Sequence, residues 1–493
     1  MKKSPVFRPA ADRYLPLFFA LVSAAVVIGA TQTWGIAVLP EQFLWLKTAQ
    51  HFLTDLPVEF SQSQFPAGPI WPLMLVVFER SGYAMEFVAR LWQALMLALL
   101  LYVVTRFYLR HLQSRLVVAG AMIVLTAGVL FFSEAFSLSP LPAALLFSTL
   151  GILALARFLL KDEVLFFLVA AIGLGLAALL WLPAVVLALG AALAIMLGAR
   201  GKLARRTSAV IVFGAVAFLP ALLILLQSGI SSDASRFYSA LYATESVTAW
   251  TMFASWPFWL RLSLTLVVMV GLLYVYLATR GPAGIGPALK RRELQVWILL
   301  TIVWLAHLLI LPLAATFVVL LPILVLWPAL GIDSFRDYDA IASLFSGRGT
   351  QIAIGSCAIL LLLPVWNTSE RCWRQARTGN GLNGFEIQSS ALLTELRSEN
   401  WRPIFCDDSE LLSYLLKSAV SPLPADLNEL ELSESRIVVL GDSCPPGICT
   451  DESLTHPMLT FIPRLASREG MIYDVTFRAP EPALAASDSL TVP

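Results

Sequence analysis

Long apolar runs recur along this chain and constrain its fold more than any other feature. A helix that crosses a membrane needs about 20 predominantly apolar residues. About eleven segments approach this requirement, at roughly 15–37, 85–108, 116–134, 139–160, 164–181, 182–199, 207–228, 257–279, 295–311, 313–331 and 350–366. The sequence therefore predicts an α-helical polytopic membrane protein with about 11 transmembrane helices.

The composition supports a membrane protein and excludes some partners. Only 14% of the 493 residues are charged, whereas about a quarter are charged in a typical soluble protein. The mean hydropathy is +0.77. The formal net charge of +1 gives no support for binding to nucleic acid.

The two ends of the first apolar run indicate how it is used. The basic start "MKKSPVFRPAADR" is typical of a signal peptide, but the following run is too long for one and "IGATQTWG" is a poor cleavage site. We expect a retained span with its basic end in the cytoplasm. Residues 67–79, "AGPIWPLMLVVFE", are short for a span and predict a partial or re-entrant helix.

Basic residues alternate between successive loops, as the positive-inside rule expects. They gather at the N-terminus and in the loops near 106–115, 161, 200–206, 280–292 and 336–348, whereas the alternate loops hold only Lys47, Arg80 and Arg236. The N-terminus is therefore predicted to be cytoplasmic. An odd number of spans places the C-terminal domain outside, which is the periplasm if the membrane is a bacterial inner membrane. The first outside loop covers 38–84.

The composition changes after residue 366. Residues 367–480 alternate helical patterns with strands at "PIFC", "SRIVVLGD" and "GMIYDVTFRA", which predicts a small α/β soluble domain. The transmembrane domain then covers 1–366, and the tail 481–493 is predicted to be disordered.

Four cysteines fall in this C-terminal region, where an oxidising compartment would allow two disulfides. We favour Cys444–Cys449, within "CPPGIC", together with Cys372–Cys406. A metal site is less favoured because the spacing is not C-x-x-C and His456 does not stand in a ligand pattern.

No phosphate-binding, metalloprotease or nucleophile-elbow motif occurs, so any chemistry must come from acidic and basic residues at the outer face. The first outside loop is the richest in them, with Glu41, Lys47, His51, Asp55 and Glu59. Further on, Arg236 stands among aromatic residues. Arg261 lies near the start of a span in "FWLRLSL", where an arginine is costly unless it is paired or faces a water-filled cavity.

The order of these features resembles the GT-C superfamily of integral-membrane glycosyltransferases. An acidic residue follows the first span, then an amphipathic "WLKTAQHFL" helix, the Pro-rich "PAGPIWPL", "ARLWQAL" leading the next span, and an α/β domain after the last span. The likeness covers essentially the whole chain in layout. Within the superfamily, this layout is similar to that of the protein mannosyltransferases and aminoarabinose transferases. It implies a sugar donor on a polyprenyl phosphate.

The resemblance also implies roles for particular residues. In that superfamily an acid in the first outside loop, often one of two adjacent acids, activates the acceptor. In "LPEQF" Glu41 stands at this position and Gln42 replaces the second acid. A single carboxylate is a poor site for a hard divalent cation, so we expect no metal or other cofactor. Asp55 and Glu59, further along the same loop, are the reserve candidates.

One acid is chemically sufficient for such a transfer. A sugar on a lipid phosphate already has a good leaving group, so the enzyme needs a base for the acceptor hydroxyl and cations for the developing phosphate charge. We assign the base to Glu41 and the phosphate contacts to Lys47, Arg236 and Arg261. The resemblance implies an inverting transfer to an envelope lipid, polysaccharide or protein.

Each of these assignments has an alternative. Glu41 could be a helix cap, Lys47 could extend to lipid headgroups, and Arg236 could be an interfacial anchor. At the level of the whole chain, the alternatives are a polytopic transporter or lipid flippase and a catalytically inactive GT-C-like scaffold of envelope assembly. The transporter is disfavoured, because the sequence shows no inverted repeat and has few ionisable residues in the middle of its spans.

Overall fold

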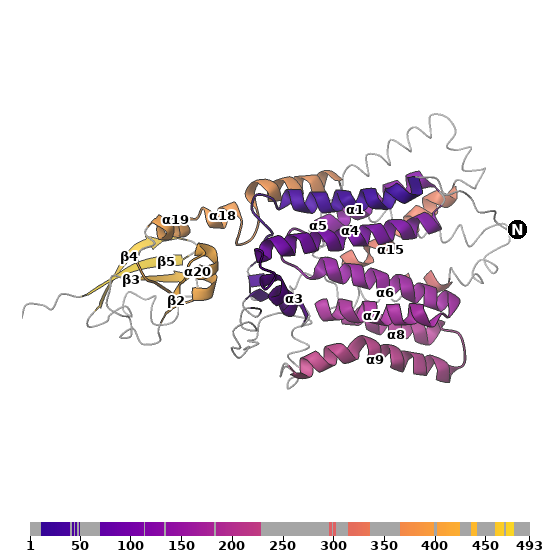
Figure 1. Cartoon of the computed structure of the whole chain (residues 1–493). Helices are drawn as coiled ribbons and strands as arrows, with labels where there is room; N and C mark the ends of the chain where they lie inside the picture. The colour runs from indigo at the N-terminus through magenta and orange to yellow at the C-terminus, as the bar shows by residue number, and fades with distance from the viewer. Residues whose placement is uncertain are drawn as a thin grey trace, which may run out of the picture. The chain divides into compact units, whose positions relative to one another are not determined.

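The computed structural model describes the greater part of the chain (Figure 1). The described residues are 11–39, 42–43, 45–46, 49, 70–112, 114–132, 135–181, 184–227, 295–297, 299–301, 314–335, 365–398, 402–423, 435–440, 459–467 and 470–477. They form two compact units that divide between Gly379 and Asn380.

The division falls after a helix over 365–378, rather than after residue 366 as the sequence predicted. Polar contacts attach this helix to the first unit. The Thr368 hydroxyl donates to the Ala127 carbonyl at 3.1 Å, and the Trp34 indole donates to the Arg377 carbonyl at 2.9 Å.

The first unit is helical, and its helices follow the apolar runs of the sequence. They are α1 (Ala11–Ala30), α3 (Ile70–Glu79), α4 (Met85–His111), α5 (Arg115–Phe132), α6 (Leu141–Lys161), α7 (Val164–Leu180), α8 (Ala184–Gly198), α9 (Leu203–Gln227) and α15 (Ala314–Phe335). Among the described residues, α4 and α6 are long and apolar enough to cross a membrane, and further apolar helices are shorter. A mostly helical unit is thus confirmed, whereas the expected count of eleven spans is not established.

Small residues let the helices of this unit approach closely. A Cβ atom added to Gly173 of α7 would lie 3.1 Å from the Gly151 Cα of α6. One added to Gly175 would lie 2.7 Å from the Ala217 carbonyl oxygen of α9. Glycine at these positions therefore permits the backbone contact that holds α7 between α6 and α9, as in many membrane helix pairs.

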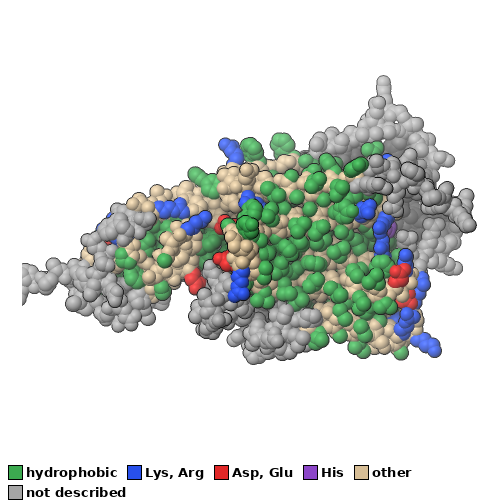
Figure 2. All heavy atoms as spheres, viewed as in Figure 1, with side chains coloured by type: hydrophobic (Ala, Val, Ile, Leu, Met, Phe, Trp, Pro, Cys, Tyr) green, Lys and Arg blue, Asp and Glu red, His purple; other side chains and the backbone are tan. Residues whose placement is uncertain are grey.

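The outside of the helical unit is apolar along its length. In α4 the side chains of Phe87, Leu91, Leu95 and Leu99 are exposed at four-residue spacing, and Leu95 keeps half of its surface open. Figure 2 shows hydrophobic side chains covering the visible flank of the unit, with charged side chains gathered near the junction of α6 and α7. Such a continuous apolar flank is costly in water and suits a lipid environment.

One end of the helical unit is held by charged and capping groups. Arg205 at the start of α9 pairs with Asp162 between α6 and α7, with an N–O distance of 3.0 Å. Asp333 of α15 accepts from the Ser114 amide before α5 at 2.8 Å. We call this the basic end, because it also carries Arg110, Arg115, Lys161, Arg200, Lys202 and Arg206. The described basic segments, near 106–115, 161 and 200–206, lie at this end, whereas residues 1–10, 280–292 and 336–348 lie outside the described residues.

The second unit is a small sheet with helices, which confirms the expected C-terminal α/β fold. Its strands are β1 (Ile404–Cys406), β2 (Ser421–Pro422), β3 (Ser435–Leu440), β4 (Leu459–Ala466) and β5 (Gly470–Phe477), in the order β2-β1-β3-β5-β4. β1 runs parallel to β2 and β3, whereas β5 is antiparallel to β3 and β4. The helices are α18 (Phe385–Gln388), α19 (Ala391–Ser398) and α20 (Ser409–Leu416).

One face of this sheet is apolar, with Ile437, Val439, Tyr473 and Val475 packed together. The opposite side of β3 and β5 carries a charged group that we call the Asp474 cluster. Asp474 Oδ1 accepts from the Arg436 Nε at 3.0 Å, and Asp474 Oδ2 from the Arg464 Nη1 at 3.1 Å. Arg402 Nη1 lies 3.4 Å from Oδ1, and Arg464 also pairs with Glu395 of α19 at 2.7 Å.

Desolvation works against the charge on Asp474, yet the hydrogen bonds from Arg464 and Arg436 outweigh it. The pKa of the Asp474 carboxyl is therefore held below its ordinary value. Arg436 is fully buried, so this carboxylate is its counter-charge inside the domain.

Candidate functional site

The candidate site lies where the chain leaves α1. Residues 31–39 form a turn that pairs with the segment before α6. The Ala37 amide donates to the Phe136 carbonyl, and the Leu138 amide donates to the Ala37 carbonyl, each at 2.8 Å. This short parallel bridge fixes the chain immediately before the predicted acidic position.

Two buried glutamines complete the attachment. Gln42 is 2% exposed; its side-chain oxygen accepts from the Leu39 amide at 3.1 Å and its side-chain nitrogen donates to the Ser137 hydroxyl at 3.2 Å. Gln93 of α4 is fully buried and donates to the carbonyls of Ser137 and Ser139 at 3.1 and 2.5 Å. We call Gln42, Gln93, Ser137 and Ser139 the amide junction.

The helical segment that follows is buried wherever the structure describes it, whereas the predicted polar positions Lys47, Gln50 and His51 lie outside the described residues. The described residues Gln42, Phe43, Trp45, Leu46 and Ala49 are helical and all buried. Their spacing places them along one face of a helix. The junction thus holds the chain on both sides of residue 41, with Leu39 before it and Gln42 after it.

Charged side chains at the start of α4 lie beside the same turn. Arg90 donates to the Thr31 carbonyl at 3.1 Å, which caps the end of α1, and its guanidinium carbon lies 5.4 Å from the Phe87 ring centre. A Cβ atom added to Gly35, whose φ is +74°, would lie 3.5 Å from Glu86 Oε2. Glu86 therefore places a carboxylate near the exit of α1.

The helix over 365–378 adds basic charge at this end of the unit. Arg371 donates to the Phe131 carbonyl, its guanidinium carbon stands 5.1 Å from the Phe131 ring, and Arg377 lies over Trp373. Arg374 pairs with Glu370 at 2.9 Å. Sequence reasoning missed these arginines because it ended the last span there. The three-residue spacing of arginines beside two tryptophans in "WNTSERCWRQART" was the available signal.

The predicted site residues divide into two groups. Those outside the described residues are Glu41, Lys47, Asp55, Arg236, Arg261, Cys444 and Cys449. Those that the structure describes are Cys372 and Cys406.

The structure shows Cys372 and Cys406 as free thiols, and the predicted Cys372–Cys406 disulfide stays a prediction. Cys372 belongs to the helix over 365–378 in the first unit, whereas Cys406 ends β1 in the second. Burial raises the pKa of the Cys372 thiol to about 11. Burial and the neighbouring Asp407 also raise the pKa of Cys406 above its ordinary range, so neither thiol is a ready nucleophile at neutral pH.

The described part of the chain offers no candidate metal centre. Within these residues, no three His, Cys, Asp or Glu side chains come together so that they could hold a metal ion. What the described residues do bring together is a neutral set of hydrogen bonds through Leu39 and Gln42, with the charges of Glu86 and Arg90 beside the turn after α1.

Solved structures share this architecture. ArnT from Cupriavidus metallidurans, bound to undecaprenyl phosphate, aligns with 94% of this chain and 98% of its own, with a TM-score of 0.56 and 14% identity. The same protein in the apo state gives a TM-score of 0.55, 13% identity and the same coverage. The chain has the GT-C fold. The alignment with ArnT is long enough to include parts of both units.

The archaeal oligosaccharyltransferase AglB from Archaeoglobus fulgidus, in complex with an inhibitory peptide and a dolichol phosphate, aligns with 88% of this chain and 70% of its own. Its TM-score is 0.49 with 12% identity. No protein-family model and no curated protein sequence matches the chain.

Proposed function

We propose that this protein is a membrane glycosyltransferase that moves a sugar from a polyprenyl-phosphate donor to a cell-envelope acceptor. The observation that carries the proposal is the alignment with ArnT, which spans nearly all of both chains and includes a structure with undecaprenyl phosphate bound. The apolar flank of the helical unit supports a place in a membrane for this chain.

The reaction takes place, in this proposal, at the periplasmic face of a bacterial inner membrane. The basic end of the helical unit gathers Arg115, Lys161, Arg200 and Arg205, and basic loops remain in the cytoplasm. The amide junction belongs to the alternate connections, which hold few basic residues. Glu41, which precedes Gln42, would then lie on the periplasmic side.

Glu41 is the general base in this mechanism. Its carboxylate takes the proton of the acceptor hydroxyl as the hydroxyl oxygen attacks the anomeric carbon. The bond to the phosphate oxygen breaks in the same displacement, and the anomeric centre inverts. The lipid phosphate leaves with the bonding electrons, so no general acid is needed.

Lys47, Arg236 and Arg261 stabilise the phosphate charge that grows during the displacement. Asp55 is the alternative base. Gln42 cannot share the role of Glu41, because its side chain is buried and held between Leu39 and Ser137. This supports a mechanism with one acid and without a pair of adjacent carboxylates for a metal.

The test follows release of polyprenyl phosphate by the purified protein in nanodiscs. A panel of polyprenyl-phosphate sugars is offered with crude envelope acceptors, with and without a chelator. Wild type should release the carrier, and Glu41→Gln should reduce the rate by about 10²-fold or more. Glu163→Gln at the basic end is the matched control and should keep the wild-type rate.

Each outcome decides something. Equal rates for Glu41→Gln and wild type would discard Glu41 and move the search to Asp55. A folded wild-type protein that releases no carrier from any donor would contradict the transferase, and lipid-sugar binding without turnover would point to a scaffold instead.

A further inference from the structure

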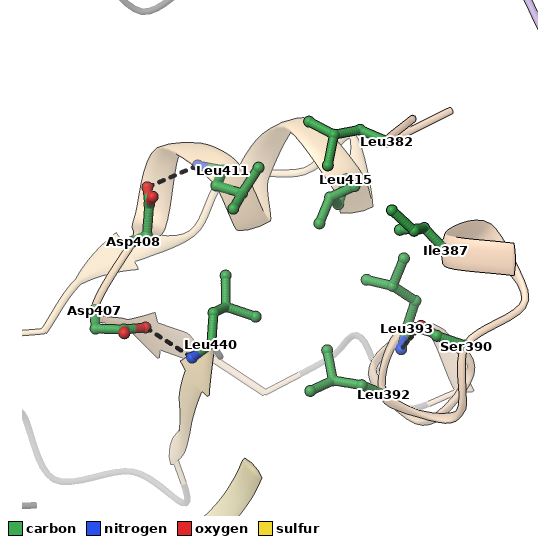
Figure 3. A pocket seen from close by; sticks show the side chains of 10 residues that line it. All are labelled: Leu382, Ile387, Ser390, Leu392, Leu393, Asp407, Asp408, Leu411, Leu415 and Leu440. Carbon is green, nitrogen blue, oxygen red and sulfur yellow. Dashed lines mark hydrogen bonds between the residues drawn. The ribbon is translucent and has the colours of Figure 1, made fainter. Parts of the chain in front are cut away.

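The C-terminal unit contains a cavity of about 360 Å³ between its helices and one edge of the sheet. Figure 3 shows that its lining side chains come from the segments around α18, α19 and α20 and from the ends of β1 and β3. The lining residues are Leu382, Ile387, Ser390, Leu392, Leu393, Asp407, Asp408, Leu411, Leu415 and Leu440. The size falls within the usual range for small-molecule sites, about 300–1,000 Å³.

The cavity occupies a particular place in the sheet topology. After β1 the chain passes through α20 to β2 on one side of β1, whereas β3 lies on its other side. The strand order therefore reverses between β1 and β3. Open α/β sheets bind ligands at such a switch point, outside the carboxyl ends of the parallel strands.

The residues at this switch point are those that line the cavity. Asp407 and Asp408 directly follow β1, and Leu440 is the last residue of β3. Because β1 and β3 are parallel, their carboxyl ends open on the same side. The Leu440 amide donates to Asp407 Oδ1 at 3.1 Å, which ties the two strand ends together (Figure 3).

The charge at the mouth of the cavity selects against anions. A helix N-terminus in this position usually attracts phosphate. At the start of α20, however, Asp408 Oδ1 already accepts from the Leu411 amide at 3.1 Å (Figure 3). Asp407 adds a second carboxylate beside it, so a phosphate or carboxylate ligand would meet like charges.

The walls opposite these carboxylates are aliphatic. Leu392 and Leu393 of α19 and Leu411 and Leu415 of α20 face the cavity (Figure 3), with Ile387 of α18. Such walls favour hydrocarbon over sugar rings or nucleobases, since they offer neither aromatic faces nor many hydrogen-bonding groups. Asp407 and Asp408 each retain a second carboxylate oxygen as an acceptor for a donor group on the ligand.

We propose that this cavity binds a neutral or cationic amphiphile. Its hydrocarbon body lies among the leucines, and its amino or hydroxyl head donates to Asp407 and Asp408. Anionic heads and nucleotides are excluded by the carboxylates. Within the proposed transferase this ligand is the hydrocarbon-bearing part of the acceptor, and only this last assignment rests on the proposed function.

The experiment uses the full-length protein in nanodiscs and three photoreactive probes of equal chain length. These are octyl compounds that carry a diazirine and end in an amine, a hydroxyl or a carboxylate. Labelled peptides are mapped after digestion. We expect the amine and alcohol to label residues 385–416 in a saturable way, and the carboxylate to label them about tenfold less, which corresponds to about 1.4 kcal/mol.

Two variants connect the labelling to the cavity. Leu411→Trp should fill the space and abolish saturable labelling, whereas Ile462→Trp, at an exposed position of β4, should leave it unchanged. Asp407→Asn should leave labelling by the alcohol probe unchanged and should reduce labelling by the amine probe relative to it. Hydrogen exchange of β3 and β5 checks that each variant is folded.

Equal labelling by all three head groups, or labelling that survives Leu411→Trp in the folded protein, would overturn the proposal. Labelling needs no turnover. A protein that fails to release polyprenyl phosphate but shows the expected labelling would therefore contradict the transferase and leave this binding site standing.

Discussion

The amide junction and the Asp474 cluster both bury polar side chains, but they use different chemistry. In the helical unit, Gln42 and Gln93 are neutral amides that bond to Ser137 and to backbone carbonyls. In the sheet unit, the fully buried Arg436 is held by the Asp474 carboxylate. The first region fixes the chain without charge, and the second does so with charge.

The difference follows from the surroundings of each region. A charge placed among apolar helices costs several kcal/mol unless it is paired. Neutral amides position the segment around residue 41 without adding a field to it. The sheet unit carries arginines on three sides of Asp474, so its polar core depends on one ionised group.

The largest effect on folding is expected where that single group is removed. Asp474→Asn leaves Arg436 buried without its counter-charge, which should destabilise the sheet unit by about 3–5 kcal/mol. Hydrogen exchange of peptides in β3 and β5 measures this loss separately from the helical unit. Glu395→Gln, which breaks only the partly exposed pair with Arg464, should cost less than about 1 kcal/mol.

A fall in pH should separate the two regions in the wild-type protein. The pKa of Asp474 is lowered in the folded state, so its contribution is complete above the unfolded value of about 4 and is lost as the pH falls through the folded pKa. Exchange of β3 and β5, corrected for the intrinsic rate, should accelerate below about pH 4. The amide junction carries no titrating group, so protection of Gln42 and Gln93 should not share this transition.

Gln42→Glu tests whether the missing second acid can be restored. The change removes the amide donor to Ser137 and buries a carboxyl group, which should destabilise the junction by about 1–3 kcal/mol. Turnover should fall and should not become dependent on a divalent metal. Gln32→Glu, at an exposed position after α1, should change neither the stability nor the turnover. A metal-dependent gain of activity in Gln42→Glu would mean that residue 42 can face the site.

Gln93→Leu breaks the junction from the other side without adding charge. The carbonyls of Ser137 and Ser139 lose their donor in a buried place, and we expect a cost of about 1–2 kcal/mol. Exchange near residues 31–49 should rise, and transfer should slow through mispositioning of the acidic segment. Leu95→Ala, on the exposed face of α4, is the control and should preserve both.

Sequence reasoning found the elements whose signal is local. The run 139–160 became α6 at Leu141–Lys161, and "PIFC" and "GMIYDVTFRA" became β1 and β5, because apolar length and alternation are readable over a few residues. β4 was missed since Pro463 and Arg464 interrupt its pattern. The structure accommodates them with an irregular register between Pro463 and Leu465, next to the residue that reaches Asp474.

The site was predictable only in part for the same reason. An acid after the first span is a local feature, so "LPEQF" could be found, and it stays a prediction because Glu41 lies outside the described residues. The buried contacts among Gln42, Gln93 and Ser137 had no local signal. They are far apart in the chain, and neutral amides resemble ordinary surface residues until the fold buries them together.

The smallest effect is expected at the basic end, where charge serves orientation more than stability. Arg205 and Asp162 form an ion pair at 3.0 Å, but their side chains are 64% and 22% exposed. Arg205→Gln should therefore destabilise the helical unit by less than about 1 kcal/mol, with Lys202→Gln as its unpaired-charge control for the loss of one positive charge. Carrier release should be unchanged in both. If Arg205→Gln destabilised the helical unit as much as Gln93→Leu does, the basic end would hold the helices as firmly as the amide junction. Its charges would then serve stability as well as orientation in the membrane.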